Sequence, residues 1–330
     1  MRATIKDVAA AAGVSIKTVS RVLNNERYVG ADTREKVQAA VAALRFHPSA
    51  AARSLAGRRS LQIAMVCDGP GAHYLLELQA GARARCEAAG VRLIVQPSDG
   101  RSPRLREDVA ALVDTTHVEG VILLPPIADD AGVLSALAER GVRAVLVSPA
   151  DAEVGSSVRV DDARAAAVMT RHLLALGHRR IGFVGGPRDV ATSRMRAEGH
   201  RAALAAAGIG EDADLFVEGG GDFASGARGG AALLELSEPP TAIFASSDEM
   251  AAGVLTAAHA RGLRCPEDVS VAGFGDDALA GYVWPALTTI RRSAREIGRH
   301  AADLLLTGAD ERREVGFELV ERGSTVGIGV

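Results

Sequence analysis

Residues 4–24, TIKDVAAAAGVSIKTVSRVLN, contain two short amphipathic patterns separated by a glycine. Thr4 is followed three residues later by Asp7, the spacing of a helix capping box, and Gly13 is the residue type that most often ends a helix. Ser15 can cap a second helix. The apolar residues that this helix would turn inward are Val19, Val22 and Leu23. The stretch therefore predicts two short helices joined by a tight turn, which is a helix-turn-helix.

A third helix can close a small core around this pair. Asp32 and Glu35 repeat the capping spacing, and an apolar face follows them. That face consists of Val37, Ala40, Val41 and Leu44. On the second helix, the residues left pointing outward are Ile16, Lys17, Ser20 and Arg21. We expect a complete three-helix module with one polar, basic face.

Charge is divided unequally along the 330 residues. Residues 1–60 contain 11 Lys and Arg against 4 Asp and Glu, a net charge of +7, so residues 61–330 carry 27 against 37, a net charge of −10. A basic amino-terminal module on an acidic body predicts a polyanionic partner, and a merely solvated basic face is the alternative. The apolar runs are too short to span a membrane, so no membrane partner is predicted.

The first sixty residues resemble the headpiece of the lac repressor and galactose repressor family of bacterial transcription regulators. The matching strings are TIKDVA at 4–9, AGVS at 12–15, TVSRVLN at 18–24, TREKV at 33–37 and PSAAARSLAG at 48–57. The resemblance implies three parts: a DNA-binding headpiece over residues 1–47, a hinge helix and linker over 48–60, and an effector-binding and dimerisation body over 61–330.

The resemblance also implies that the second helix lies in the DNA major groove, where Ile16 and Lys17 select the operator. A lysine can donate to guanine O6 and N7, and an isoleucine can contact a thymine methyl. Arg21 offers a forked donor to guanine, with phosphate contact as the alternative. The other headpiece residues that the resemblance assigns to DNA are Thr4, Ser15, Thr18, Ser20, Asn24, Tyr28 and Thr33.

A helix over residues 49–56 would be too short to be stable alone in water. The resemblance implies that it folds against a partner hinge and the DNA minor groove, where Leu55 wedges into the central base step. Ser49 and Ala52 are the other hinge residues assigned to DNA. An ordinary linker helix is the alternative. If the hinge needs its partner, a ligand that separates two bodies would melt it and act as a switch.

In the body, helix-period stretches alternate with apolar strands. A glycine, the usual helix C-cap, precedes apolar runs at 91–95, 142–147, 180–184 and 269–274, and a weaker run near residue 215. This alternation predicts βαβ units with parallel sheets, and about ten strands are too many for one tidy open sheet. We expect two doubly wound α/β subdomains around a cleft, as in the periplasmic sugar-binding proteins. Family analogy places one over 61–160 plus 291–321 and the other over 161–290 plus 322–330.

Ligands of such sheets bind beyond the carboxyl ends of the strands. The candidate effector-binding residues at these ends are His73, Tyr74, Arg196, Phe223, Ser247, Asp248, Gly275 and Asp276. Arg196 aligns with an arginine that commonly holds effector oxygens in the resembled family. Tyr74 and Phe223 are candidate aromatic walls, with simple packing as the alternative for both.

One string departs from the family pattern. Members that bind neutral sugars often carry Phe-Asp-Asp after the late strand, whereas GFGDD at 273–277 places Gly275 at the first aspartate. Ser247 likewise stands where an asparagine is frequent. Loss of a fixed negative charge beside Arg196 favours an anionic effector such as a sugar acid. A neutral sugar held by other groups remains an open alternative.

The sequence supports an enzyme or a solute-binding protein less well than a DNA-binding regulator. The sequence has no GxGxxG turn, P-loop, HExxH or GxSxG elbow, and its 3 cysteines form no CxxC pair, so we predict no enzyme, cofactor or metal site. A solute-binding protein is the alternative for the body, but it should carry an export signal and lack residues 1–60. The charged start predicts a cytoplasmic protein. Recognition of a pseudo-palindromic operator predicts a homodimer, and the lack of leucine heptads before Val330 argues against a tetramer-forming tail.

Overall fold

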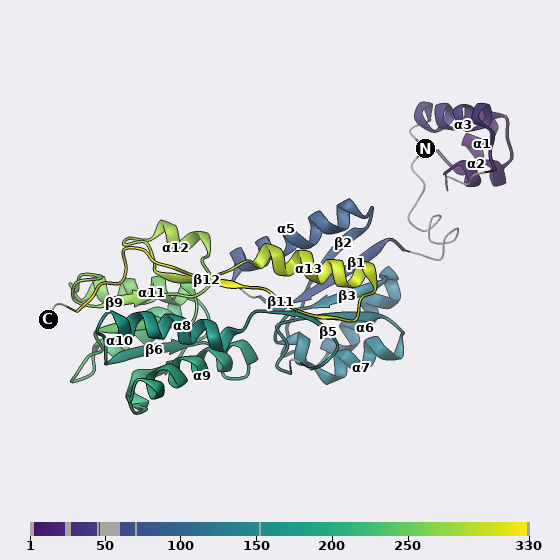
Figure 1. The fold of residues 1–330 in the computed structure, drawn as a ribbon. Coiled ribbons are helices and arrows are strands. Elements are labelled where there is room, and N and C mark those ends of the chain that lie inside the picture. The colour runs from purple at the N-terminus through teal and green to yellow at the C-terminus, as the bar shows by residue number, and fades with distance from the viewer. Residues whose placement is uncertain are drawn as a thin grey trace. The chain divides into compact units, whose positions relative to one another are not determined.

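The computed structural model describes residues 3–23, 28–44, 46, 60–69, 71–151 and 153–328. The chain divides into two compact units, Met1–Leu61 and Gln62–Val330, and Figure 1 labels most of their elements. Four residues to which the sequence analysis assigns DNA contacts lie outside the described residues: Asn24, Ser49, Ala52 and Leu55.

Three helices build the first unit: α1 (Ile5–Ala12), α2 (Ile16–Leu23) and α3 (Ala31–Ala43). The Thr4 side chain accepts from the Asp7 amide and the Asp7 carboxylate accepts from the Thr4 amide, so the predicted capping box is confirmed. Gly13 ends α1 with a φ of 64°, a left-handed conformation that glycine adopts without strain. The buried core of this unit consists of Val8, Ala9, Val19, Val22, Val37, Ala40 and Phe46.

The start of α3 differs from the prediction. The sequence indicates Asp32 as the cap, but the cap position is Gly30, two residues earlier, and no side chain caps the helix. Asp32 lies instead in the first turn, where its negative charge favours the positive end of the helix dipole. The apolar face is as predicted, with Val41 and Leu44 packed at the edge of the core.

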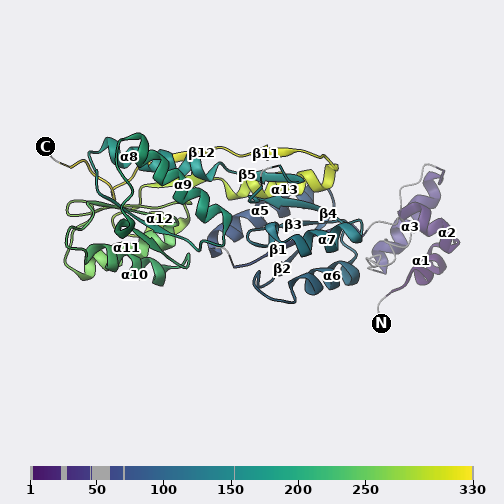
Figure 2. The same ribbon diagram turned by 90° about the horizontal axis from the view of Figure 1, so that it is seen from below.

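The first lobe of the second unit is built on a six-stranded parallel sheet in the order β11-β5-β4-β3-β1-β2. Its strands are β1 (Gln62–Cys67), β2 (Arg92–Pro97), β3 (Gly120–Leu123), β4 (Arg143–Val147), β5 (Ser156–Arg159) and β11 (Arg312–Glu314). Its helices are α5 (Ala72–Ala88), α6 (Leu105–Thr116), α7 (Ala131–Glu139) and α13 (Ala294–Thr307). Helices α5 and α13 lie side by side on one face, and α6 and α7 cover the other (Figures 1 and 2).

The second lobe is built on a four-stranded parallel sheet in the order β7-β6-β8-β9. Its strands are β6 (Ile181–Gly185), β7 (Phe216–Glu218), β8 (Ala242–Ala245) and β9 (Ser270–Ala272). Its helices are α8 (Asp162–Ala175), α9 (Ala191–Ala206), α10 (Phe223–Leu234), α11 (Asp248–Ala260) and α12 (Ala278–Tyr282). Residues of α8 and α9 share one buried core with Phe183 and Phe244, and residues of α10 and α11 share another with Ile243.

The predicted architecture of two doubly wound lobes is confirmed. An antiparallel ribbon of β10 (Thr289–Arg292) and β12 (Phe317–Val320) completes the strands of the described residues. Strand β11 was not predicted, because its three residues, Arg312, Arg313 and Glu314, form a polar edge strand without the apolar run that marks a central one.

In the part of the chain that the structure describes, no helix is both long and apolar enough to cross a membrane.

Candidate functional site

The first candidate site is the exposed face of α2. Val19 and Val22 are buried on the opposite face, whereas Ile16 is 45% exposed and Lys17 and Arg21 are exposed. The exposed residues of α2 thus place one large apolar side chain beside two cations. This face can offer both donors and an apolar contact to a partner.

The neighbouring polar residues are already engaged in fixing the helices. The Ser15 and Thr18 hydroxyls lie 2.8 Å apart, and the Thr18 amide donates to the Ser15 hydroxyl at 3.1 Å. Thr4 is held by Asp7 in the capping box. Tyr28 is 97% exposed just before α3, and Thr33 is half-buried in the first turn of that helix. Ser15 and Thr18 therefore stabilise the start of α2, whereas the Tyr28 side chain is open to a partner.

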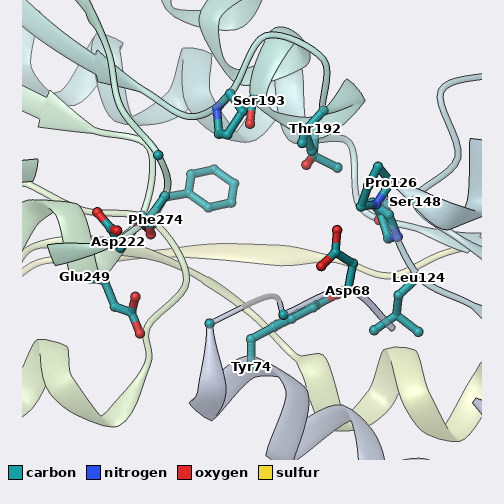
Figure 3. A pocket seen from close by; sticks show the side chains of 18 of the residues that line it. Asp68, Tyr74, Leu124, Pro126, Ser148, Thr192, Ser193, Asp222, Glu249 and Phe274 are labelled. Carbon is teal, nitrogen blue, oxygen red and sulfur yellow. Dashed lines mark hydrogen bonds between the residues drawn. The ribbon is translucent and has the colours of Figure 1, made fainter. Parts of the chain in front are cut away.

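The second candidate site is a cavity of about 390 Å³ between the two lobes of the second unit. Its walls come from the segments beyond the carboxyl ends of the parallel strands, as doubly wound sheets predict. Figure 3 shows Asp68 and Tyr74 on one side of this cavity and Thr192 and Ser193 on the other, with the ring of Phe274 between the two sides. The other polar and charged residues of the wall are Arg101, Ser148, Arg196, Asp222, Ser247, Glu249, Asp277 and Arg292.

The structure brings together only part of the candidate effector residues. Those that line the main cavity are Tyr74, Arg196 and Ser247. Those that line a smaller adjoining cavity of about 160 Å³, which also contacts Tyr74, Asp277 and Arg292, are His73, Gly275 and Asp276. Phe223 begins α10 and is 46% exposed, and Asp248 is fully buried, so neither lines either cavity.

Arg196 is rigidly held at the cavity wall. Its Nε donates to Asp162 Oδ1 at 2.7 Å and its Nη1 donates to the Ser246 carbonyl oxygen at 2.7 Å. The guanidinium lies over the Phe274 ring, 4.0 Å from the centroid. Burial lowers the pKa of Arg196, while the Asp162 carboxylate opposes that shift. A preorganised donor of this kind can bind a ligand oxygen without reorganising first.

Arg292, the last residue of β10, is a cavity residue that the sequence analysis missed. Its guanidinium lies 4.0 Å from the Tyr74 ring centroid and 5.7 Å from that of Phe274. Among the described residues its side chain has no hydrogen-bond or ion-pair partner, and its buried Nε is unsatisfied. The sequence could have indicated Arg292 only through its position at the end of a strand, and Arg291 lies just one residue before that end.

Asp248 is buried behind the cavity wall and holds part of that wall in place through hydrogen bonds. Burial raises the pKa of Asp248 to about 6, although hydrogen bonds from the Thr289 hydroxyl at 2.6 Å and the Asp277 amide at 2.8 Å oppose that shift. These bonds tie α11 to β10 and to the loop after β9. Asp248 therefore fixes Asp277, which faces the cavity.

Carboxylates are abundant around the cavity despite Gly275. Asp277, two residues further on, faces the cavity together with Asp68, Asp222 and Glu249. The pKa of Glu249 is raised by burial and by the nearby carboxylates of Asp277 and Asp222. The premise that Gly275 removes the fixed negative charge from this site is therefore wrong, because the loop supplies a carboxylate from another position. The cavity presents carboxylates, guanidinium groups and two aromatic rings together.

Comparisons with known proteins identify a family for both parts of the chain. Residues 4–49 match the bacterial regulatory proteins of the lacI family, and residues 170–325 match the periplasmic binding protein-like domain. The ribose operon repressor of Escherichia coli (strain K12) is 32% identical over 329 residues, which cover 98% of this chain and 99% of the repressor. The repressor PurR of Photobacterium profundum is 32% identical over 330 residues, covering 98% of each chain.

Solved structures give the same result. A lac repressor dimer bound to operator and the anti-inducer ONPF is 31% identical, with a TM-score of 0.90 and coverage of 99% of this chain and 100% of that one. The complex of the transcriptional regulator CelR with cellobiose is 30% identical, with a TM-score of 0.73 and coverage of 98% and 100%. The chain therefore belongs to the lacI family of bacterial regulatory proteins, as its helix-turn-helix string and its two-lobed body predict.

Proposed function

We propose that this protein is a sequence-specific transcriptional repressor that binds a pseudo-palindromic operator as a homodimer and is controlled by a small sugar or sugar-acid effector. The observation that carries the proposal is the pairing, in one chain, of a basic headpiece whose α2 exposes Ile16 and Lys17 with a body that encloses a polar cavity of about 390 Å³. Its relatives are named as repressors, and the family consists of DNA-binding regulators rather than enzymes.

In this proposal α2 enters the major groove, and Ile16, Lys17 and Arg21 contact base edges. The residues proposed to position the headpiece on the backbone are Thr4, Ser15, Thr18, Ser20, Asn24, Tyr28 and Thr33. Ser49, Ala52 and Leu55 are proposed to contact the minor groove at the centre of the operator. We propose three parts: a DNA-binding headpiece over 1–47, a hinge helix and linker over 48–60, and an effector-binding and dimerisation body over 61–330.

The chemistry of the cavity supports a polyhydroxylated effector. Carboxylates accept from hydroxyl groups, guanidinium groups donate to ring and hydroxyl oxygens, and the faces of Phe274 and Tyr74 suit the apolar side of a sugar ring. The ribose operon repressor and the CelR–cellobiose complex are named for sugars. A sugar acid remains the second candidate, because Arg292 forms no direct ion pair among the described residues, although the charge of Asp277 lies near it.

Calorimetry with matched pairs, ribose against ribonate and cellobiose against cellobionate, tests this choice. We expect the neutral sugar of each pair to bind more tightly, because the four cavity carboxylates repel an aldonate. Arg292→Gln should then weaken binding of the neutral sugar only modestly. Tighter binding of the aldonate, lost in Arg292→Gln, would select the sugar acid instead. If neither pair binds, a sugar or sugar-acid effector of monosaccharide or disaccharide size is contradicted.

The homodimer is supported by an exposed aromatic pair on the second lobe. Tyr282 is 83% exposed and Trp284, the single tryptophan of the chain, is 86% exposed. Large exposed rings are typical of interfaces. Trp284→Glu should shift the sedimentation coefficient from that of a dimer to that of a monomer, whereas an unchanged dimer would place the interface elsewhere.

The first experiment is selection of bound duplexes from a random DNA pool by the purified protein at near-physiological salt. A pseudo-palindrome with a flexible central step would support the repressor, for which we propose a cytoplasmic location beside its DNA target. Recovery of no specific sequence, both without ligand and with metabolite extracts, would favour the alternative of a solute-binding protein of the same body fold.

A further inference from the structure

The second lobe contains another cavity, of about 140 Å³, which shares no lining residue with the cavity between the lobes. It lies between α9, β6 and the segment that leads into β7. Its apolar and aromatic walls are Ile181, Phe183, His200, Leu204, Ala205, Ile209, Leu215 and Phe216. Its charged rim is formed by Arg179, Arg201, Glu211 and Asp212. Nothing in the proposed repressor function uses this cavity.

Three rings give the cavity an aromatic floor. Phe183 stacks on His200 with centroids 4.7 Å apart and on Phe216 with centroids 5.4 Å apart. Arg201 lies over the Phe216 ring at 4.8 Å and pairs with Glu211 at 2.8 Å, so the rim is fixed by its own ion pair. The rim carries two arginines and two carboxylates, whose charges sum to zero, so the aromatic floor favours a flat, uncharged ligand.

His200 supplies one polar atom inside this apolar setting. Its Nδ1 lies 2.9 Å from the Thr170 hydroxyl, which donates its single proton to the Ala166 carbonyl oxygen at 2.9 Å. We assign the ring hydrogen to Nδ1, which then donates to Thr170, because this arrangement gives the Thr170 hydroxyl, the Ala166 carbonyl and Nδ1 one bond each. In the neutral ring Nε2 is then an acceptor.

The acceptor at Nε2 is unused. His200 is only 3% exposed, and burial lowers the pKa of His200 to about 3, so the ring is neutral at physiological pH. Among the described residues Nε2 has no hydrogen-bond partner. It is also not one of the polar atoms that are completely buried without a partner, so it remains accessible from the cavity that His200 lines. A ligand donor placed against Nε2 would form a hydrogen bond that no described residue makes.

The size of the cavity limits the ligand to one ring. An apolar protein cavity of roughly 150 Å³ accommodates benzene, and this one measures about 140 Å³. We propose that this cavity of the second lobe is a binding site for a single planar ring that carries one O–H or N–H donor, with the ring against Phe216 and the donor on His200 Nε2. Phenol is the simplest member of that class.

Phenol binding to the full-length protein, measured by calorimetry, tests the site. Ala205 lines the cavity mouth near the end of α9 and is exposed, so Ala205→Trp can cover the mouth without disturbing the core. Ala206→Trp is the matched control, because Ala206 is the next exposed residue of the same helix and does not line the cavity. We expect at least a tenfold loss of phenol affinity in Ala205→Trp and less than a twofold change in Ala206→Trp. Undetectable binding by the unaltered protein, or equal affinities in the two variants, would overturn the proposal.

Toluene, which has nearly the shape of phenol but no donor, tests the role of His200 Nε2. A net hydrogen bond to a buried acceptor makes phenol bind about fivefold more tightly than toluene. His200→Phe should reverse that preference while keeping the aromatic floor. If the unaltered protein prefers toluene, Nε2 is not the anchor and the assigned ligand class is wrong. This comparison needs no variant, so it stands even if His200→Phe fails to fold.

Discussion

Lys17 combines exposure with a fixed position one residue into α2, beside the exposed Ile16. Its ammonium can reach guanine O6 and N7 if α2 lies in the major groove. Lys17→Ala should therefore weaken operator binding by about 1–3 kcal/mol and relax the preference at one base position per half-site. Fluorescence anisotropy with a set of single-base operator variants measures both effects.

Lys36 on α3 is the matched control, since it is an exposed lysine of the same headpiece outside α2. Lys36→Ala should lower affinity for all duplexes alike through the loss of one charge. If Lys17→Ala shows the same uniform loss, Lys17 contacts phosphate and does not read sequence.

Asp248 makes stability depend on pH. Burial raises the pKa of Asp248 in the folded state to about 6 from its ordinary value of 3.8, so between these values the folded protein holds a proton that the unfolded chain has released. The stabilisation is complete below the unfolded value and is lost as the pH rises through 6. The unfolding free energy of the unaltered protein should fall across this window relative to that of Asp248→Asn. Denaturant unfolding at pH 4, 5, 6 and 7 measures the difference, and parallel curves for the two proteins would contradict the assignment.

At the scale of elements, α5 and α13 approach closely through two glycines. A methyl group at Gly81 would overlap the Arg295 carbonyl oxygen, and one at Gly298 would overlap the Leu78 carbonyl oxygen. Both obstacles are backbone atoms, which cannot move aside without shifting a helix. Gly81→Ala should destabilise the body by about 1–3 kcal/mol through this overpacking. It should also displace α5, whose first turn carries Tyr74.

Gly281→Ala is the control for that substitution. Gly281 lies in α12 with open space around its Cα, so alanine there should be neutral or slightly stabilising. Thermal unfolding of the two variants separates a steric effect from the general preference of helices for alanine. Equal melting temperatures would mean that the two helices can move apart at little cost.

The elements themselves were largely predictable because buried parallel strands are continuous apolar runs. Runs such as residues 142–147 coincide with β4 to within one residue. The end of a helix was also readable where a glycine adopts a left-handed φ, as at Gly141 and Gly177. Helix starts were less certain, because α3 begins at Ala31 without any side-chain cap. The pattern of apolar residues fixes which face is buried but leaves the first turn ambiguous.

At the scale of the whole molecule, the sequence could name the strand ends that form the cavity but not the side chains that face it. Asp222 caps α10 and lines the cavity, whereas its neighbour Phe223 points to solvent. Arg292 lines it, whereas Arg291 pairs with Asp276 and Glu318. Arg291 and Arg292 leave β10 on opposite sides because side chains alternate along a strand, and which side faces the cavity is set by tertiary packing that no local pattern encodes.

The two lobes are also joined by an ion pair beside the cavity. Arg101, before α6, donates from Nη2 to Asp189 Oδ2 at 2.7 Å and from Nε at 3.1 Å, and Asp189 belongs to the second lobe, before α9. Both side chains are exposed, at 69% and 58%, so salt should screen the pair strongly. Because the pair requires the lobes to be close, it favours the closed arrangement around a bound ligand.

Asp189→Asn should therefore weaken effector binding by a few-fold at low salt, as expected for an exposed ion pair, with the difference fading toward 1 M salt. Calorimetry with whichever sugar the matched pairs identify measures it. Glu139→Gln removes a comparably exposed partner of Arg106 within the first lobe, so it changes the same charge without touching the lobe contact. If Glu139→Gln and Asp189→Asn lower affinity equally, the effect comes from net charge and the Arg101–Asp189 pair does not bias closure.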